Sequence, residues 1–339
     1  MTYNRPLHLW AMVTGWATLG LIFAGGLVTS TGSGLSVPDW PNTYGRFMFA
    51  FPLSDMVGGI FYEHSHRLIA SLVGMLMVIL AVWLWRTEER GWVRRLGWIA
   101  LTAVIAQGLL GGITVLLLLP TPVSVLHAVL AQTFFLLVIA LGYVTSREFT
   151  SEAQAAPVTP SAQDIRRWVT LTTGLIFLQL LLGAMMRHTG AGLAYFDFPL
   201  AGGRYWSAFS ADLIEEINWR RWGLELPSVT RGQLLIHFTH RLGALGVALA
   251  VVTTMVKIWR DQERVRSLRP MAGAMLVLLL GQISLGALTV LSLKQVTITT
   301  AHVAAGAALL GLSFLTTLRV YHFYPRSRGP NLATVPVHV

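Results

Sequence analysis

Four of the ten histidines are placed to bind a metal ion or a haem iron. His66, His127, His240 and His302 each lie near one end of a long apolar stretch. An ionisable side chain at membrane depth is costly, so a functional role is its default interpretation. Two facing imidazoles at equal depth can supply both axial ligands of a haem iron, and bundle interiors commonly hold cofactors. The alternative, histidines bonding across helices at the interface, explains one such residue better than four.

A carboxylate accompanies one of these histidines. Glu63 precedes His66 by three residues, so both share a helix face, and His237 precedes His240 with the same spacing. The two histidine sites are therefore built alike but differ at this position, which is Glu63 in the first and His237 in the second. A carboxylate near an iron-bound substrate can relay protons or stabilise a cation, and the site without it suits plain electron transfer. The alternative for Glu63 is a helix N-terminal residue favoured by the dipole.

Other side chains narrow the chemistry further. Arg67 and Arg241 directly follow their histidines, where they could pair with haem propionates or extend toward lipid headgroups. There are no cysteines, which excludes a disulfide, a Cys-ligated zinc and an iron–sulfur cluster. Two histidines per site, with Glu63 as the only third candidate ligand, make a zinc site unattractive.

The elements that must position these residues are membrane helices. Of 339 residues, 54% are hydrophobic and only 12% are charged, which excludes a disordered chain and a soluble globular enzyme. A span needs about 20 mostly apolar residues. Eight stretches qualify, so the predicted fold is an all-α integral membrane protein with these spans: 7–29, 63–85, 92–119, 123–145, 168–187, 234–259, 270–293 and 297–321.

The basic residues orient the chain. With the N-terminus inside, 16 of the 25 Lys and Arg residues lie on the inner side together with 7 of the 15 acidic residues. The positive-inside rule then places both termini in the cytoplasm. The net charge of +10 therefore reflects basic residues that set the topology and contact membrane lipid. These residues are scattered over several loops, which argues against nucleic-acid binding.

The chain is an internal duplication. Ordered segments match at offsets of 158 to 175 residues: TGSGL at 31–35 with TGAGL at 189–193, EHSHRL at 63–68 with HFTHRL at 237–242, QGLLGGITV at 107–115 with QISLGALTV at 282–290, and HAV at 127–129 with HVA at 302–304. Each half has four spans, so the halves share one orientation. The sequence predicts two tandem pseudo-symmetric four-helix bundles. Their expected boundaries are 1–147, a cytoplasmic linker 148–164, 165–325, and a cytoplasmic tail 326–339.

At these residues the chain resembles the haem A synthase family, over nearly its whole length. The resemblance is carried by GGLVT at 25–29, TGSGLS at 31–36 with PDWP at 38–41, ExxHR at 63–67, QGxxGGxTV at 107–115, His127, His240-Arg241 and His302. It implies oxidation of the haem O methyl group to the formyl group of haem A by successive hydroxylations, for terminal oxidase biogenesis. Molecular oxygen and an external electron donor are implied as well.

The resemblance also implies roles for single residues. His66 and His127 would flank the iron of the substrate haem O, and His240 and His302 would ligate a haem b cofactor. Glu63 matches a glutamate important to the family's function. The implied location is the bacterial cell (inner) membrane. The implied partners are a haem O synthase and cytochrome oxidase assembly factors, and a homo-oligomer is allowed.

The chain departs from this resemblance at one place, and two alternative functions remain open. Many bacterial members carry a cysteine pair in outer loops, whereas residues 37–43 read VPDWPNT here, so a thiol relay is no part of this protein's mechanism. A non-catalytic dihaem b-type cytochrome would predict two similar haems and no product. A transporter of parallel repeats would predict charges near the midplane, whereas the ionisable residues gather at one end of the spans.

Overall fold

The computed structural model describes residues 3–151, 160–206, 209–261 and 265–324, and throughout these ranges the regular elements are helices. Eight helices are long and apolar enough to cross a membrane, as expected. They are α1 (Arg5–Ser30), α2 (Gly58–Thr87), α3 (Gly91–Leu116), α4 (Thr121–Val144), α6 (Pro160–His188), α8 (Arg231–Arg260), α9 (Arg269–Leu291) and α10 (Val296–Phe323). The protein is therefore an all-helical, multi-pass membrane protein.

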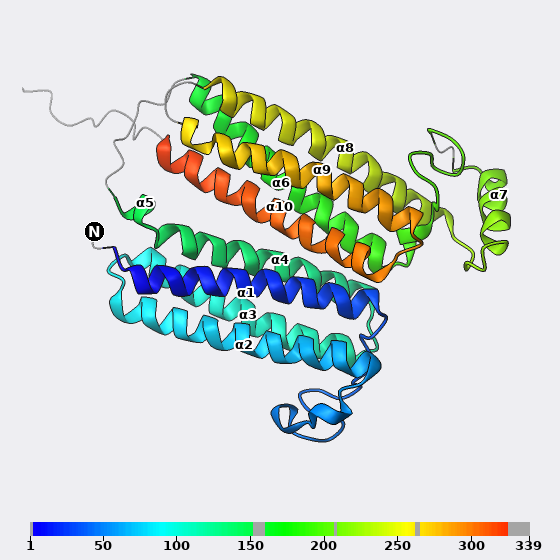
Figure 1. Cartoon of the computed structure of the whole chain (residues 1–339), viewed down its shortest axis with the longest axis horizontal. Coiled ribbons are helices and arrows are strands. Elements are labelled where there is room, and N and C mark those ends of the chain that lie inside the picture. The colour runs from blue at the N-terminus through cyan, green and yellow to red at the C-terminus, as the bar shows by residue number, and fades with distance from the viewer. Residues whose placement is uncertain (1–2, 152–159, 207–208, 262–264, 325–339) are drawn as a thin grey trace, which may run out of the picture.

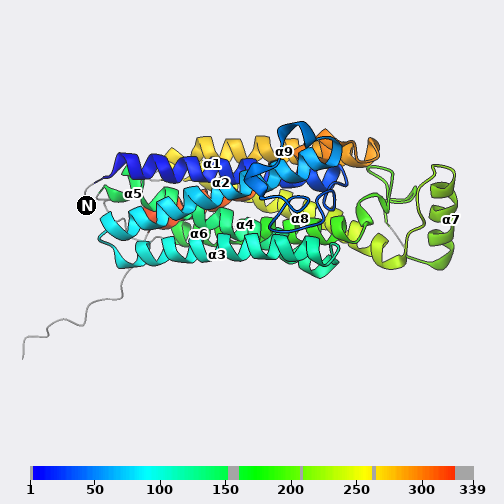
Figure 2. The same ribbon diagram turned by 90° about the horizontal axis from the view of Figure 1, so that it is seen from below.

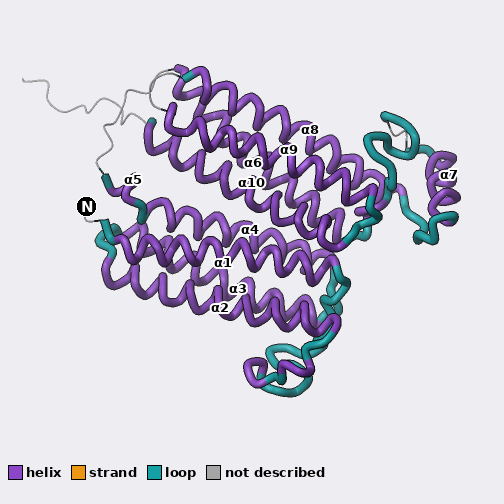
Figure 3. Tube along the Cα trace, in the orientation of Figure 1, coloured by secondary structure: helices purple, strands orange, loops and turns teal. Residues whose placement is uncertain are grey.

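The long helices form two groups of four (Figure 1, Figure 3). In the first half, α1 and α3 each pack against α2 and α4; in the second half, α6 and α9 each pack against α8 and α10. The halves meet where α1 and α4 contact α10 and where α4 contacts α6. The order of packing around each group is thus the same.

The two long loops lie at one end of these groups, which we call the loop end. The first loop covers 31–57 and the second covers 189–230. The N-terminus and the short helix α5 (Arg147–Thr150) lie at the opposite end (Figure 1, Figure 2). The connections between helices at that opposite end are shorter than these two loops, so the loop end carries most of the described chain outside the membrane helices.

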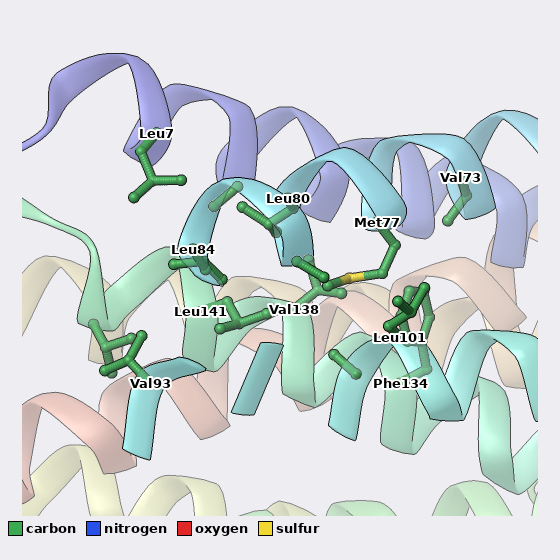
Figure 4. Packing of buried hydrophobic residues seen from close by; sticks show 14 residues of the cluster. Leu7, Val73, Met77, Leu80, Leu84, Val93, Leu101, Phe134, Val138 and Leu141 are labelled. Atoms are coloured by element: carbon green, nitrogen blue, oxygen red, sulfur yellow. The ribbon is translucent and has the colours of Figure 1, made fainter. Parts of the chain in front are cut away.

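Aliphatic side chains fill the first half away from the loop end. Val73, Met77, Leu80 and Leu84 recur at helical spacing on α2 and are fully buried. Figure 4 shows Met77 and Leu80 directed toward Val138 and Leu141 of α4. This close-packed part fixes how α2 and α4 face each other, and so positions the residues nearer the loop end.

Glycine stops the first helix of each half. Gly32 follows α1 and Gly190 follows α6, and both have φ of +70°, which disfavours any residue with a Cβ. Backbone N–H groups just before these glycines bond back to the last turn: Thr31 N to Leu27 O and Thr189 N to Met185 O. The repeated Thr-Gly-x-Gly-Leu motif is therefore a helix stop, as its glycines predict.

The structure differs from the expected boundaries in two places. α6 begins at Pro160, inside the predicted linker 148–164, and α5 occupies the start of that linker; residues 152–159 and the predicted tail 326–339 lie outside the described residues. The second loop also contains an unpredicted helix, α7 (Ala211–Trp222). Ser210 caps it, and Leu213 and Ile217 bury one face of it.

Candidate functional site

The four repeated histidines come together as two pairs near the loop end. His66 of α2 lies near His127 of α4, and His240 of α8 lies near His302 of α10. In each half the pair comes from the helices that stand opposite each other in the group. The predicted pairing by repeat is thus realised in space.

A glycine of a neighbouring helix makes room for each imidazole. A Cβ added to each glycine would lie close to Cε1 of the nearby histidine. The distance is 3.1 Å for Gly25 and His66, and 3.0 Å for Gly111 and His127. It is 3.2 Å for Gly183 and His240, and 3.0 Å for Gly286 and His302. These glycines repeat at the same offsets as the motifs around them. Each imidazole therefore occupies a place that a larger residue would close.

The imidazole nitrogens are only partly hydrogen-bonded by the protein. Nδ1 of His66 and Nδ1 of His127 are buried without a hydrogen-bond partner. In the second half, His302 Nδ1 donates to Gln282 O (3.1 Å), and His240 Nδ1 lies 3.1 Å from Gln179 Nε2. A buried polar atom left unpaired costs about 1–3 kcal/mol, and in the first half a bound group that bonds to these nitrogens would offset this cost. The donor set in each half fits a haem iron with two axial imidazoles.

The described residues hold no group of three or more His, Cys, Asp or Glu side chains placed for a metal ion. Each pair therefore offers two protein ligands, the number that a haem iron needs beside its four porphyrin nitrogens. Gln107 supports this arrangement in the first half, because its Nε2 donates to His127 O (3.0 Å) and ties α3 to α4.

Glu63 and Arg67 fasten the first loop to α2. Glu63 is 2% exposed; its Oε2 accepts from Val37 N (2.7 Å) and its Oε1 from Arg67 Nη2 (2.6 Å). Arg67 also donates to the carbonyl oxygens of Val37 (2.7 Å), Asp39 (2.7 Å) and Asn42 (3.0 Å). A buried ion pair in this form needs every oxygen and N–H satisfied, and the loop backbone provides the partners.

The second half repeats this clamp with different chemistry. Tyr195 N donates to His237 Nδ1 (3.3 Å), and Arg241 Nε lies 3.1 Å from His237 Nε2. Arg241 also donates to Leu200 O (2.7 Å) and Asp197 O (2.8 Å). A neutral imidazole has one acceptor nitrogen, whereas the carboxylate of Glu63 accepts both bonds. The first half thus has a carboxylate, ion-paired with Arg67, at the position where the second half has an imidazole.

The loop contacts of Arg67 and Arg241 were missed by sequence reasoning, which expected both guanidinium groups to pair with haem propionates or to extend toward lipid headgroups. The signal for the loop role was present: Asp39 and Asp197, whose carbonyl oxygens accept the bonds, repeat at the offset of 158. Contact with propionates stays a prediction.

The Asp39 side chain shapes the first loop and gives it a pH dependence. Its carboxylate accepts from Tyr44 N (2.8 Å) and Gly45 N (2.8 Å). Burial raises the pKa of Asp39, but the Gly45 and Tyr44 N–H groups and the Arg67 charge outweigh it and hold this pKa below its usual 3.8. A lowered folded-state pKa stabilises the loop above the unfolded value and ceases to do so as the pH falls through the folded value.

We therefore expect pepsin to cut the first loop increasingly fast as the pH falls below about 3.8, the ordinary value for this carboxyl. Asp39→Asn removes the titrating group, so its cutting rate, corrected for pepsin activity on an unfolded substrate, should not rise over that range. An equal rise in both proteins would contradict this assignment.

Polar contacts at the loop end join the two halves. Arg187 Nη2 of α6 donates to Gly26 O (3.0 Å) and Ser30 Oγ (2.8 Å) of α1, and Thr300 Oγ1 of α10 donates to Ser30 Oγ (3.0 Å). Arg187 lies near His302, and the adjacent His188 lies near His127. Sequence reasoning gave neither Arg187 nor His188 a role. Neither has a matching basic residue in the other half, so the repeat gave no signal for them.

Comparison with known proteins shows the family to which the chain belongs. The family model described as cytochrome oxidase assembly protein (COX15-CtaA) matches residues 8–314. A protein of Shouchella clausii named heme A synthase is 27% identical over 291 residues, covering 85% of this chain and 88% of its own. One of the same name from Symbiobacterium thermophilum is 32% identical over 276 residues (78% and 79%), and one from Halalkalibacterium halodurans is 25% identical over 333 residues (96% and 99%). Because the family model spans most of the chain, this protein belongs to the COX15-CtaA family of cytochrome oxidase assembly proteins.

Proposed function

We propose that this protein is a haem A synthase, which oxidises the methyl group of haem O to the formyl group of haem A. The observation that carries the proposal is the pair of histidine sites. Both sites have two imidazoles with a glycine beside each, but only the first has the carboxylate of Glu63, where the second has His237. Two sites of one plan with one chemical difference suit a substrate haem and a cofactor haem. The names of the relatives support the same activity.

The first half, 1–147, would bind the substrate. His66 and His127 flank the iron of haem O, and Gly25 and Gly111 leave room for their rings. Two successive hydroxylations of the methyl carbon, with molecular oxygen and an external electron donor, give a gem-diol that loses water to the formyl product. Glu63 lies one helical turn from His66 and either stabilises positive charge developing at the methyl carbon or moves protons.

The second half, 165–325, would hold haem b. His240 and His302 would be its axial ligands, with Nδ1 of His302 already oriented by Gln282 O. When bound, this group supplies one-electron redox chemistry. Arg67 and Arg241 would contribute positive charge near the propionates while their Nη atoms hold the loops. The protein would lie in a bacterial cell membrane with both termini in the cytoplasm, and receive haem O from its synthase.

The glycines beside the imidazoles give a test of this division. Leucine at Gly286 would overpack the space next to His302, at a cost of about 1–3 kcal/mol, so retention of haem b should fall about tenfold. Leucine at Gly111 should instead weaken binding of haem O and leave haem b in place. Haem b content, measured by absorbance after purification, and haem O titration check the two expectations.

Gly273→Leu is the matched control, because Gly273 lies on the same helix as Gly286 and a Cβ there meets nothing within 4 Å. Loss of haem b in the Gly111→Leu protein but not in the Gly286→Leu protein would reverse the assignment of the two halves.

Activity is tested directly by supplying haem O, oxygen and a reductant to the purified protein. We expect conversion to haem A through a hydroxylated intermediate, seen by chromatography of the extracted haems. Haem O that binds and stays unchanged over many hours would contradict the proposed function.

A further inference from the structure

An apolar hollow of about 270 Å³ lies between α2 and α3 in the first half. Gly74 and Val78 of α2, Val104 and Gly108 of α3, and Trp40 of the first loop contribute to its walls. Ile105 and Leu109 at its edge are 54% and 52% exposed, so the hollow opens toward the membrane side of the helices. It offers no charged group to a ligand and suits a hydrocarbon chain.

Two glycines create this space. A Cβ on Gly74 or on Gly108 would meet nothing within 4 Å. At the offsets that align the histidines of the two halves, Gly74 corresponds to Ala248 and Gly108 to Ile283. The second half thus carries side chains where the first half carries none. The space is a feature of the half to which we assign the substrate.

Trp40 closes the hollow toward the loop end. A Cβ on Gly112 would lie 2.4 Å from the Trp40 ring, so only glycine allows the indole to lie there. The corresponding residues in the second half are Phe198 and Ala287. The Trp40 backbone is held by the neighbouring Asp39 O, which accepts from Arg67. The clamp that orients Glu63 therefore also places Trp40.

One turn of α3 joins the hollow to the histidine site. Gln107 donates to His127 O, Gly111 lies against the His127 ring, and Gly108 between them lines the hollow. A chain attached to the edge of a haem held by His66 and His127 would therefore begin within about one turn of α3 from the hollow. Haem O carries a long isoprenoid chain there, and haem b does not.

We propose that this hollow, closed by Trp40, binds the isoprenoid tail of the substrate haem and so distinguishes haem O from haem b. The inference rests on the proposed function and deepens it by naming what selects the substrate. Each buried CH₂ contributes about 0.8 kcal/mol, so displacing a few carbons of the tail costs tenfold or more in affinity. The second half, with Ala248 and Ile283, needs no such space for a tail-less haem b.

The test compares two haems in one protein. Haem O or tail-less haem b is titrated into the first site of protein whose second site already holds haem b, and the two dissociation constants are measured by absorbance. For Gly108→Leu we expect the constant for haem O to rise about tenfold, equal to about 1.4 kcal/mol, and that for haem b to stay unchanged. Gly74→Leu should act in the same way from the other wall.

Gly281→Leu is the matched control, since it lies on α9 and a Cβ there also meets nothing within 4 Å. Haem b retained by the second site reports that each variant is folded. If Gly108→Leu and Gly74→Leu both leave the affinity for haem O unchanged and instead lose bound phospholipid, the hollow holds a lipid chain and the proposal is overturned. An equal rise for both haems would overturn it as well. Failure of product formation with normal haem O preference would count only against the proposed function.

Discussion

Replacing Glu63 by glutamine is expected to lower haem A formation about 100-fold, the usual contribution of a positioned acid–base or charged group. Glutamine keeps the size of the side chain and can still accept from Val37 N through its carbonyl oxygen. The lost feature is the negative charge beside the first histidine pair. Turnover of haem O by the purified protein, with haem b content measured in parallel, checks this expectation.

The second half supplies the control for this variant. His237 occupies the place of Glu63 and contacts Tyr195 N and Arg241 as Glu63 contacts Val37 N and Arg67. His237→Gln keeps one acceptor for the loop, so we expect turnover within about threefold of the parent, since it removes no charge used in catalysis. Full haem A formation by the Glu63→Gln protein would remove the carboxylate from the mechanism. An equal loss in both variants would reduce both residues to loop clamps.

Replacing His302 by alanine is expected to leave less than about a tenth of the haem b. The affinity of the second half for haem b depends on both axial ligands, and loss of one ligand should lower this affinity by at least about 10–100-fold. His127→Ala should have the opposite selectivity, with haem b retained and haem O no longer held. The two haems are distinguished by chromatography after extraction.

His322→Ala is the matched control for the His302 variant. His322 lies on the same helix, α10, at the end opposite the candidate site, where its ring packs against Tyr143 and Phe149. It should retain haem b fully. Haem b retained by the His302→Ala protein, or lost equally from the His322→Ala protein, would contradict the assignment of His302 as a ligand.

The membrane helices and the histidine pairs were predictable from sequence. The predicted spans 7–29 and 234–259 lie within Arg5–Ser30 and Arg231–Arg260. A long apolar run fixes a span because lipid leaves the backbone no other hydrogen-bond partner. The pairing of His66 with His127 was expected because each lies near the end of its span on the same side of the membrane, and the repeat gave His240 and His302 the same arrangement.

The loop contacts were not predictable in the same way. Glu63 and Val37 are 26 residues apart, and the conformation of the first loop depends on backbone bonds such as those to Asp39. No periodic pattern in the sequence specifies such contacts. The contact of Arg187 with Gly26 was out of reach for another reason: it joins the two halves, and an internal repeat aligns the halves without saying how they meet.

The most direct test of the account is the haem content of the protein purified from cells that also make haem O. Extraction and chromatography should yield haem b together with haem O, a hydroxylated intermediate or haem A, which would show two unlike sites and conversion at one of them. Haem b alone, with haem O supplied and no conversion, would instead identify an electron-transfer cytochrome. No haem of any kind would contradict the assignment of His66, His127, His240 and His302 as ligands.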